Sequence, residues 1–407
     1  MDNISQKLTK ILSRSTLKRS KRPFFSSGPC VKHAGWSLQK SLQYFEENLI
    51  GISHRSPIGV SRVADLIGKL REILEIPQSH KIAILPASST GAIETAIWNL
   101  LGKPRVGIDS ISWDLFSKTW ELDVREQLKI QDVTPFCVKD IENLHNRDHS
   151  RDILFSLTGT TSGLSLNKES LKFLEKRKGI SVCDAASAVM TSEIDWSLLD
   201  ATGFSLQKGF GAEAGTGVLV LSTMALKRLS EYTPSWPIPK IFRLKSYDGS
   251  IIDGIFRGEM INTQSLLCIE EAIDAVTYAQ NSGGLKHALS QIEQNFKELE
   301  SWVKAKEWVM FLVEDERYRA KSCVCLKITD SYFNTLTTEK QWLFLNEMQL
   351  GLSHINAAHN IVNHPLCGTP SLRIWCGPTV ETEDISSLLP WIELAFTAMK
   401  GLCSEKL

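Results

Sequence analysis

The chain has 407 residues, which is enough for two domains, because a single hydrophobic core rarely grows beyond about 300 residues. Lys plus Arg and Asp plus Glu both number 46, so charge gives no reason to expect nucleic acid or an anionic membrane as a partner. The nine cysteines lack the spacing of a zinc site, which indicates buried thiols and no metal. No apolar run approaches the roughly 20 residues that cross a bilayer.

Residues 1–22 are rich in Lys and Arg and contain one acidic residue, Asp2. Ile4, Leu8 and Leu12 fall on one face of a helix, a pattern that is typical of organelle transit peptides. A solvated, frayed tail on a cytoplasmic protein has the same composition. We expect the second, and predict a basic N-terminal extension at 1–22 and a cytoplasmic location, with organelle targeting as the alternative.

From about residue 80, short apolar runs alternate with helical patterns. The predicted strands are Lys81–Leu85, Asp152–Leu157, Ile180–Cys183, Thr202–Leu206 and Val218–Leu221. This alternation predicts a mostly parallel sheet with helices on both faces. Polar or glycine-rich segments follow several of the strands, and we expect them to form a ligand site at the edge where the strands end.

A second α/β pattern follows Gly283-Gly284. We expect helices over 285–306, 340–350 and 385–399, and strands over 323–328 and 371–376. The predicted fold is therefore α/β, with a large domain over residues 23–284 and a smaller C-terminal domain over 285–407.

Asp184 ends one predicted strand and Lys208 follows the next, so both are expected at the same edge of the sheet. A lysine there can form a Schiff base with an aldehyde cofactor such as pyridoxal phosphate, and a carboxylate can keep the pyridine nitrogen of that cofactor protonated. Asp and Lys are also common at strand ends without such a role. The pair alone leaves both interpretations open.

Four further features suit a ligand, and each also has an ordinary structural explanation. Ser88–Gly91 lies near a helix start, which suits a phosphate group or a simple helix cap. The Trp113 indole either stacks on a flat ring or fills space in the core. His54 and Arg55 suit a phosphate or carboxylate. Arg373 lies in an apolar strand and requires either a salt bridge or a substrate carboxylate.

The order of these segments resembles that of the phosphoserine aminotransferases, a class V family among the fold-type I pyridoxal-phosphate enzymes. The segments that carry the resemblance are Phe25–Cys30, Ser53–Ser56, Pro86–Ala92, Gly159–Gly163, Cys183–Ala188, Ser205–Lys208, Ile261–Thr263 and Leu372–Gly377. They span nearly the whole chain. The resemblance implies the fold-type I architecture, pyridoxal phosphate as cofactor and a homodimer.

The resemblance also assigns cofactor-binding residues. It implies that Lys208 forms the Schiff base and that Asp184 pairs with the pyridine nitrogen. The other implied cofactor-binding residues are Ser89, Thr90, Trp113, Thr160, Gln207, Asn262 and Thr263. Trp113 would stack on the ring, and Asn262 and Thr263 would reach the cofactor phosphate of the partner subunit.

The implied substrates are O-phospho-L-serine and 2-oxoglutarate, which give 3-phosphohydroxypyruvate and glutamate in serine biosynthesis, and a related reaction serves pyridoxine biosynthesis. The implied substrate-binding residues are Ser27, His54, Arg55 and Arg373. Arg373 would bind the α-carboxylate, and His54 and Arg55 would bind the substrate phosphate from the partner subunit.

The chain departs from the usual family pattern at Thr158, Leu206 and residues 209–217. Another class V aminotransferase, such as the alanine–glyoxylate type, is the first alternative, although it has no need of a second anion site. A cysteine desulfurase is disfavoured because Gln207 stands where that family typically has a histidine. An inactive pyridoxal-phosphate-binding homologue is the remaining alternative.

Overall fold

The computed structural model describes residues 4–404 and divides into two compact units. The large unit holds Lys32–Gly159 and Ser165–Lys286, and the small unit holds the chain up to Val31, Thr160–Leu164, and the chain from His287 onward. This division differs in two places from the predicted domains at 23–284 and 285–407. The N-terminal stretch and the short segment 160–164 both group with the C-terminal residues.

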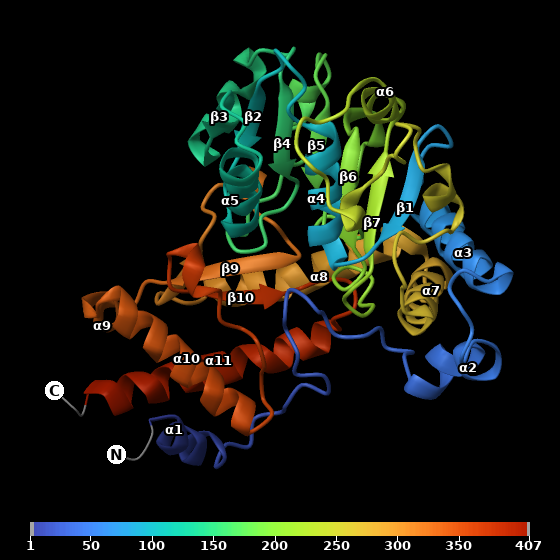
Figure 1. Cartoon of the computed structure of the whole chain (residues 1–407). Helices are drawn as coiled ribbons and strands as arrows, with labels where there is room; N and C mark the ends of the chain where they lie inside the picture. The colour runs from blue at the N-terminus through green and yellow to red at the C-terminus, as the bar shows by residue number, and fades with distance from the viewer. Residues whose placement is uncertain (1–3, 405–407) are drawn as a thin grey trace. The chain divides into compact units, whose positions relative to one another are not determined.

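The large unit is built around a seven-stranded sheet in the order β1-β7-β6-β5-β4-β2-β3 (Figure 1). Its strands are β1 (Lys81–Leu85), β2 (Ile108–Ile111), β3 (Val133–Phe136), β4 (Asp152–Ser156), β5 (Ser181–Asp184), β6 (Ala201–Ser205) and β7 (Gly217–Leu221). Only β7 runs antiparallel to its neighbours, β1 and β6. The predicted strands and the mostly parallel sheet are confirmed, whereas β2 and β3 were not predicted.

Helices cover this sheet because its strands are buried on both faces. The helices are α2 (Leu38–Asn48), α3 (Pro57–Ile73), α4 (Ser88–Leu100), α5 (Leu115–Leu122), α6 (Thr223–Glu231) and α7 (Leu266–Asn281), and a π-helical turn, η1 (Asp123–Gln127), continues α5. Helix α4 packs on β5, β6 and β7. A Cβ at Gly203 would lie 2.5 Å from Ile93 Cδ1, so glycine allows α4 to approach β6 closely.

The small unit has an antiparallel three-stranded sheet in the order β10-β9-β8. Its elements are α1 (Ile4–Leu12), β8 (Val309–Phe311), β9 (Cys323–Ile328), α9 (Ser331–Thr335), α10 (Thr338–His354), β10 (Ser371–Trp375) and α11 (Thr382–Ser404), and α8 (Gly284–Lys304) begins at the end of the large unit. The helices and strands predicted after residue 284 are confirmed, and β8 and α9 are additional.

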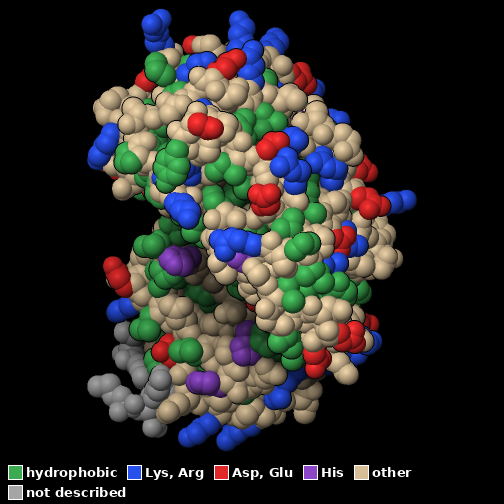
Figure 2. Space-filling model, turned by 45° about the vertical axis from the view of Figure 1, so that its right-hand side comes forward, with side chains coloured by type: hydrophobic (Ala, Val, Ile, Leu, Met, Phe, Trp, Pro, Cys, Tyr) green, Lys and Arg blue, Asp and Glu red, His purple; other side chains and the backbone are tan. Residues whose placement is uncertain are grey.

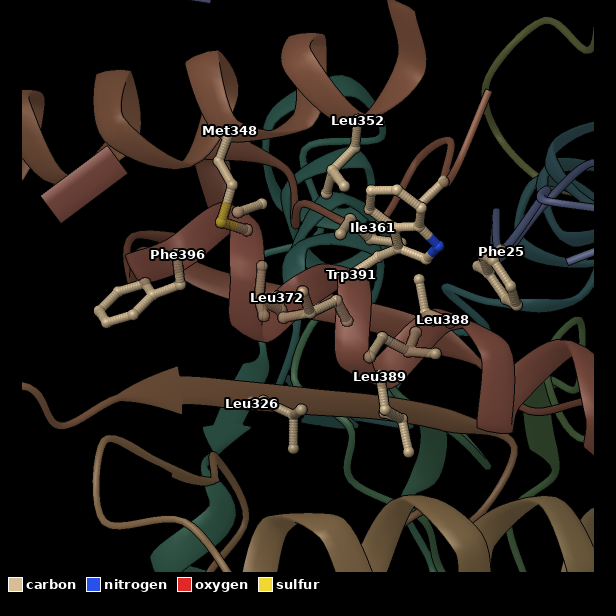
Figure 3. Packing of buried hydrophobic residues seen from close by; sticks show 14 of the residues in the cluster. Phe25, Leu326, Met348, Leu352, Ile361, Leu372, Leu388, Leu389, Trp391 and Phe396 are labelled. Carbon is tan, nitrogen blue, oxygen red and sulfur yellow. The ribbon is translucent and has the colours of Figure 1, made fainter. Parts of the chain in front are cut away.

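The core of the small unit is formed by side chains from its three strands and the long helices. Figure 3 shows Met348 and Leu352 of α10 with Trp391 and Phe396 of α11, near Leu372 of β10. Burying side chains of this size contributes about 1.5–3 kcal/mol each relative to leaving them exposed.

Helix α1 belongs to this core. Leu8 and Leu12 are fully buried, and α1 packs against α10 and α11. A Cβ at Gly351 would lie 2.5 Å from Leu8 Cδ2, so α10 leaves room for that leucine. The Trp391 indole donates to the Lys18 carbonyl at 3.0 Å. The prediction of a solvated, frayed tail is therefore wrong for residues 4–22, whose apolar helical face is a packing face.

The surface is consistent with the balanced composition. On the face shown in Figure 2, Lys and Arg side chains are interspersed with Asp and Glu side chains. Among residues 4–404, no helix combines the length and the apolar character needed to cross a membrane.

Candidate active site

Asp184 is the last residue of β5 and pairs in register with Gly203 of β6. The side chain is buried, and each carboxylate oxygen accepts one hydrogen bond: Oδ1 from the Ala186 N–H at 2.9 Å and Oδ2 from Trp120 Nε1 at 3.0 Å. Burial raises the pKa of Asp184, while the Ala186 N–H, the charge of Lys208 and the Trp120 indole lower it. The β5 end thus presents a carboxylate that is held by specific donors.

Lys208 follows β6 and is also buried. Its Nζ donates to Ser187 Oγ at 2.7 Å, and Ser187 lies in the loop after β5. A Cβ at Gly209 would lie 2.3 Å from the Val189 carbonyl oxygen, so the residue after the lysine has no room for a side chain. The edge of the sheet therefore brings the predicted lysine and carboxylate to neighbouring strand ends.

The start of α4 has an unusual backbone, in which the Ser88 N–H donates to the Gly215 carbonyl oxygen at 3.1 Å. Ala87 and Ser88 have φ values of 64° and 61°, in the left-handed region. Ala87 occupies the N-cap position and offers no capping side chain, unlike a simple Ser or Thr cap. A Cβ at Gly91 would lie 2.0 Å from the Pro86 carbonyl oxygen, so only glycine fits there. A helix start of this kind favours an anion.

Gln207 lies beside this helix start. Ser88 Oγ donates to Gln207 Oε1 at 3.1 Å, which joins the first turn of α4 to the residue before Lys208. Ser89 and Thr90, the predicted phosphate-binding residues, are the next two residues of the same turn. The three predicted phosphate ligands on this chain therefore lie around one helix start.

Trp113 lies in the loop between β2 and α5 and is buried. Within residues 4–404, its Nε1 has no hydrogen-bond partner. Asp114 caps α5 in a capping box with Ser117 and so fixes the chain directly after the indole. The ring of Phe116, in the first turn of α5, lies 5.8 Å from Lys208 Nζ, which places this turn beside the lysine.

His54, Arg55 and Thr263 line one pocket of the large unit, with a volume of about 320 Å³. His54 is buried, and its Nε2 has no partner among the described residues. Burial and the charge of the neighbouring Arg55 lower the pKa of His54 below its ordinary value. Asn262, the neighbour of Thr263, is half-buried with an unpartnered Oδ1.

Ser27, Thr160 and Arg373 lie in the small unit, around β9. Cys323 Sγ lies 3.3 Å from Ser27 Oγ and 3.0 Å from the Thr160 carbonyl oxygen. Arg373 pairs in register with Cys325, and its Nε is buried without a partner in the described chain. No salt bridge to Arg373 occurs within residues 4–404, so the structural alternative considered for it is not realised there.

The residues that depart from the family pattern have structural contacts. Thr158 Oγ1 lies 3.2 Å from Ser165 Oγ, and Leu206 is fully buried in the large unit. Glu213, in the loop after Lys208, forms an ion pair with Lys32 at 2.9 Å, and its N–H donates to Glu271. Thr158, Leu206 and Glu213 are not themselves among the predicted site residues.

The large unit offers groups that fit pyridoxal phosphate. A buried carboxylate suits the ring nitrogen, a primary amine suits the aldehyde, a helix start suits the phosphate, and a buried indole with an unpartnered N–H suits an aromatic ring. Two contacts in this set, Trp120 with Asp184 and Ser187 with Lys208, were not predicted. Ser187 lies in a segment that carried the resemblance, whereas no sequence signal marked Trp120.

The comparisons with known proteins identify the family. A family model described as aminotransferase class-V matches residues 108–354. The phosphoserine aminotransferase of Methanosarcina barkeri is 38% identical over 382 residues, which cover 93% of this chain and 98% of that protein. The chain belongs to the class V aminotransferase family. The resemblance predicted from the sequence is confirmed, and with it an enzyme that transfers amino groups with pyridoxal phosphate.

Solved structures agree on the fold. A phosphoserine aminotransferase from Cytophaga hutchinsonii superposes with a TM-score of 0.75 at 19% identity, covering 91% of this chain and 98% of that chain. A pyridoxal-phosphate-bound phosphoserine aminotransferase from Trichomonas vaginalis gives a TM-score of 0.70 at 16% identity, covering 91% and 99%. The predicted fold-type I architecture is therefore confirmed.

Proposed function

We propose that this enzyme transfers the amino group of O-phospho-L-serine to 2-oxoglutarate, and the reverse, with pyridoxal phosphate as cofactor. The observation that supports phosphoserine as the substrate is a pocket lined by His54 and Arg55. The pocket of His54 and Arg55 is lined by residues other than those at the start of α4, and two neighbouring basic side chains there suit a phosphate group in addition to that of the cofactor. The 38% identity to a phosphoserine aminotransferase over nearly the whole chain supports the same substrate.

The large unit supplies the chemistry through a few side chains. When bound, the cofactor supplies a ring that accepts the electrons released as the Cα–H bond of the substrate breaks. Asp184 would accept a hydrogen bond from the protonated ring nitrogen and so keep that proton in place. The Lys208 amine would act as the base that removes the Cα proton of the substrate. Ser89, Thr90 and Gln207 hold the cofactor phosphate.

Substrate recognition uses the remaining predicted residues. We assign the α-carboxylate to Arg373, with Ser27 nearby, and the region of the ring hydroxyl to Thr160. The Nε of Arg373, which is buried and has no hydrogen-bond partner among the described residues, supports this, because a buried donor without a partner is costly unless a ligand supplies one. His54 and Arg55 receive the phosphate, and the approach of a dianion favours the protonated form of His54.

The proposal includes a homodimer in which His54, Arg55, Asn262 and Thr263 serve the partner subunit. Exposed apolar side chains around the pocket support it: Ile50, Ile52 and Leu267 are 68%, 40% and 39% exposed. Apolar groups gathered at one pocket suit contact with a second copy. We expect a dimer in sedimentation, and a fully active monomer would contradict this part of the proposal.

We place the reaction in serine biosynthesis. A phosphorylated threonine analogue would use the same groups, so a part in pyridoxine biosynthesis is included. We also propose a cytoplasmic location. The cysteines are free thiols, which suits a reducing compartment, and residues 4–22 pack into the small unit rather than standing apart for cleavage.

Half-reaction spectra test the substrate. The purified protein is loaded with pyridoxal phosphate, and its absorbance is followed after separate additions of phosphoserine, glutamate and alanine. Rapid conversion of the cofactor to its amine form by phosphoserine and glutamate, with little by alanine, is the expected result. Conversion by alanine but not by phosphoserine would support an aminotransferase reaction and would reject phosphoserine as its substrate.

A further inference from the structure

The indole of Trp120 lies directly against the Asp184 carboxylate. Trp120 belongs to α5, and only 4% of its surface is exposed. Its Nε1–H donates to Asp184 Oδ2 at 3.0 Å, while the Ala186 N–H donates to Oδ1 at 2.9 Å. With one donor on each oxygen, the plane of the carboxylate is fixed, and the remaining lone pairs stay available to a ring N–H.

An indole N–H donates and never accepts, so it discriminates between the two protonation states of its partner. It stabilises the ionised carboxylate and gives no partner to a proton on Oδ2. Other titratable groups also act on Asp184. Burial raises the pKa of Asp184 and Asp114 adds to that rise, whereas Lys208 lowers it. Burial also raises the pKa of the adjacent Cys183 thiol, so this group stays uncharged.

Helix α5 holds Trp120 in a fixed position. The neighbouring Glu121 is fully buried, and its carboxylate accepts hydrogen bonds from Ser112, Lys118 and Arg125. Because α5 begins just after Trp113, one helix positions both the indole predicted to stack on the ring and the indole that binds Asp184. The two contacts would therefore move together if α5 moved.

We infer that Trp120 is a positioning residue for the aminotransferase reaction, which acts through Asp184 by keeping its carboxylate ionised and correctly oriented toward the ring nitrogen of the cofactor. The inference rests on the role proposed for Asp184. Without the indole N–H, Asp184 holds the ring N–H less strongly. Cofactor affinity and the protonation behaviour of the bound cofactor then change together, which a purely structural loss would not produce.

The test compares two buried tryptophans in the full-length protein. Trp120→Phe removes the donor to Asp184, and Trp196→Phe is the matched control, because Trp196 is 5% exposed and donates to the Leu74 carbonyl at 2.7 Å. The readouts are the dissociation constant for pyridoxal phosphate by equilibrium dialysis and the pH midpoint of the visible absorbance of the bound cofactor. Trp120→Phe is expected to weaken binding about tenfold and to shift the midpoint, because a hydrogen bond to a charged group is lost.

A second variant separates the hydrogen bond from packing. Replacing the Trp120 side chain with benzothienylalanine keeps its shape and exchanges the N–H for sulfur, so the same result is expected even if Trp120→Phe folds poorly. In a protein that already carries Asp184→Asn, the Trp120 substitution is expected to weaken cofactor binding little further. The carboxylate charge that the indole N–H stabilises is then absent.

The outcomes are distinct. Normal cofactor binding in both Trp120 variants, together with weak binding in Asp184→Asn, would overturn the positioning role and leave the role of Asp184 intact. Equal losses in Trp120→Phe and Trp196→Phe would also overturn it, since the loss would then be general. Normal binding and absorbance in Asp184→Asn would remove the proposed role of Asp184 itself and this inference with it.

Discussion

At the scale of single residues, the site depends on polar groups that are buried and yet held by specific partners. Asp184 and Lys208 were predictable because each is a polar residue directly after an apolar run, at the end where parallel strands place their ligands. Trp120 was not predictable, because its partner lies 64 residues away in the sequence and the contact depends on how α5 packs. A local pattern does not contain such a contact.

Lys208→Ala is expected to prevent covalent attachment of the cofactor, because Lys208 supplies the amine that follows β6. Borohydride treatment followed by peptide mass spectrometry should fix pyridoxal phosphate on the peptide that contains Lys208 in the wild type and not in the variant. Lys227→Ala is the control, since Lys227 on α6 of the same unit is 73% exposed and is not among the residues of the site. A cofactor still fixed to the protein in Lys208→Ala would refute the assignment.

The second residue-scale prediction concerns the substrate phosphate. The double substitution His54→Gln and Arg55→Gln is expected to slow the phosphoserine half-reaction by about 100-fold or more, because two charge-assisted hydrogen bonds are lost. The alanine half-reaction should change little. Arg257→Gln removes an exposed charge from the same unit and serves as control. Equal losses with both amino donors would contradict the phosphate role.

At the scale of elements, continuous apolar runs were predictable, whereas strands β2 and β3, whose short apolar runs are interrupted, were not. Strand β2 carries Asp109, which is buried and bonded to Arg147 at 2.8 Å and Arg151 at 2.6 Å. A charged residue interrupts the apolar run, and the arginines that neutralise it come later in the chain. Strand β3 contains a proline, which its place at the sheet edge tolerates. Helix α4 was predicted, but its left-handed start at Ala87 was not.

The start of α4 gives an element-scale prediction. Gly91→Ala is expected to weaken pyridoxal phosphate binding about tenfold or more, because a methyl group at 2.0 Å from the Pro86 oxygen forces the first turn to move away from its anion-binding geometry. Equilibrium dialysis measures the effect. Gly68→Ala in α3 is the control, since a Cβ there meets nothing within 4 Å. Unchanged affinity in Gly91→Ala would argue against a phosphate at this helix.

At the scale of the whole molecule, the alternation of strand and helix patterns was sufficient to predict the α/β fold class with a mostly parallel sheet. The assignment of residues 4–22 failed because amphipathic basic helices are alike in sequence whether they are exposed or packed. What decides the outcome is the apolar surface of α10 and α11, more than 300 residues away, as the bond from Ser5 to Glu347 illustrates. The grouping of 160–164 with the small unit depends equally on long-range contacts.

Leu8→Ala tests the packing of α1. Because Leu8 is fully buried against α10, its truncation is expected to lower the free energy of unfolding by about 2–5 kcal/mol. Ile11→Ala on the exposed side of the same helix should cost about 0.5 kcal/mol or less. Urea denaturation curves measure both. Similar small effects in both variants would show that α1 contributes little to the unit.

The packing of α1 against α10 and α11 also has a consequence for folding during synthesis, because these helices are far apart in sequence. The large unit is nearly continuous in sequence and is complete once residue 286 has left the ribosome. The burial of Leu8 and Leu12 is complete only after α11 has been synthesised. Until then the apolar face of α1 is not covered by α10 and α11. A nascent chain that stops before α11 therefore leaves this face exposed to aggregation or proteolysis.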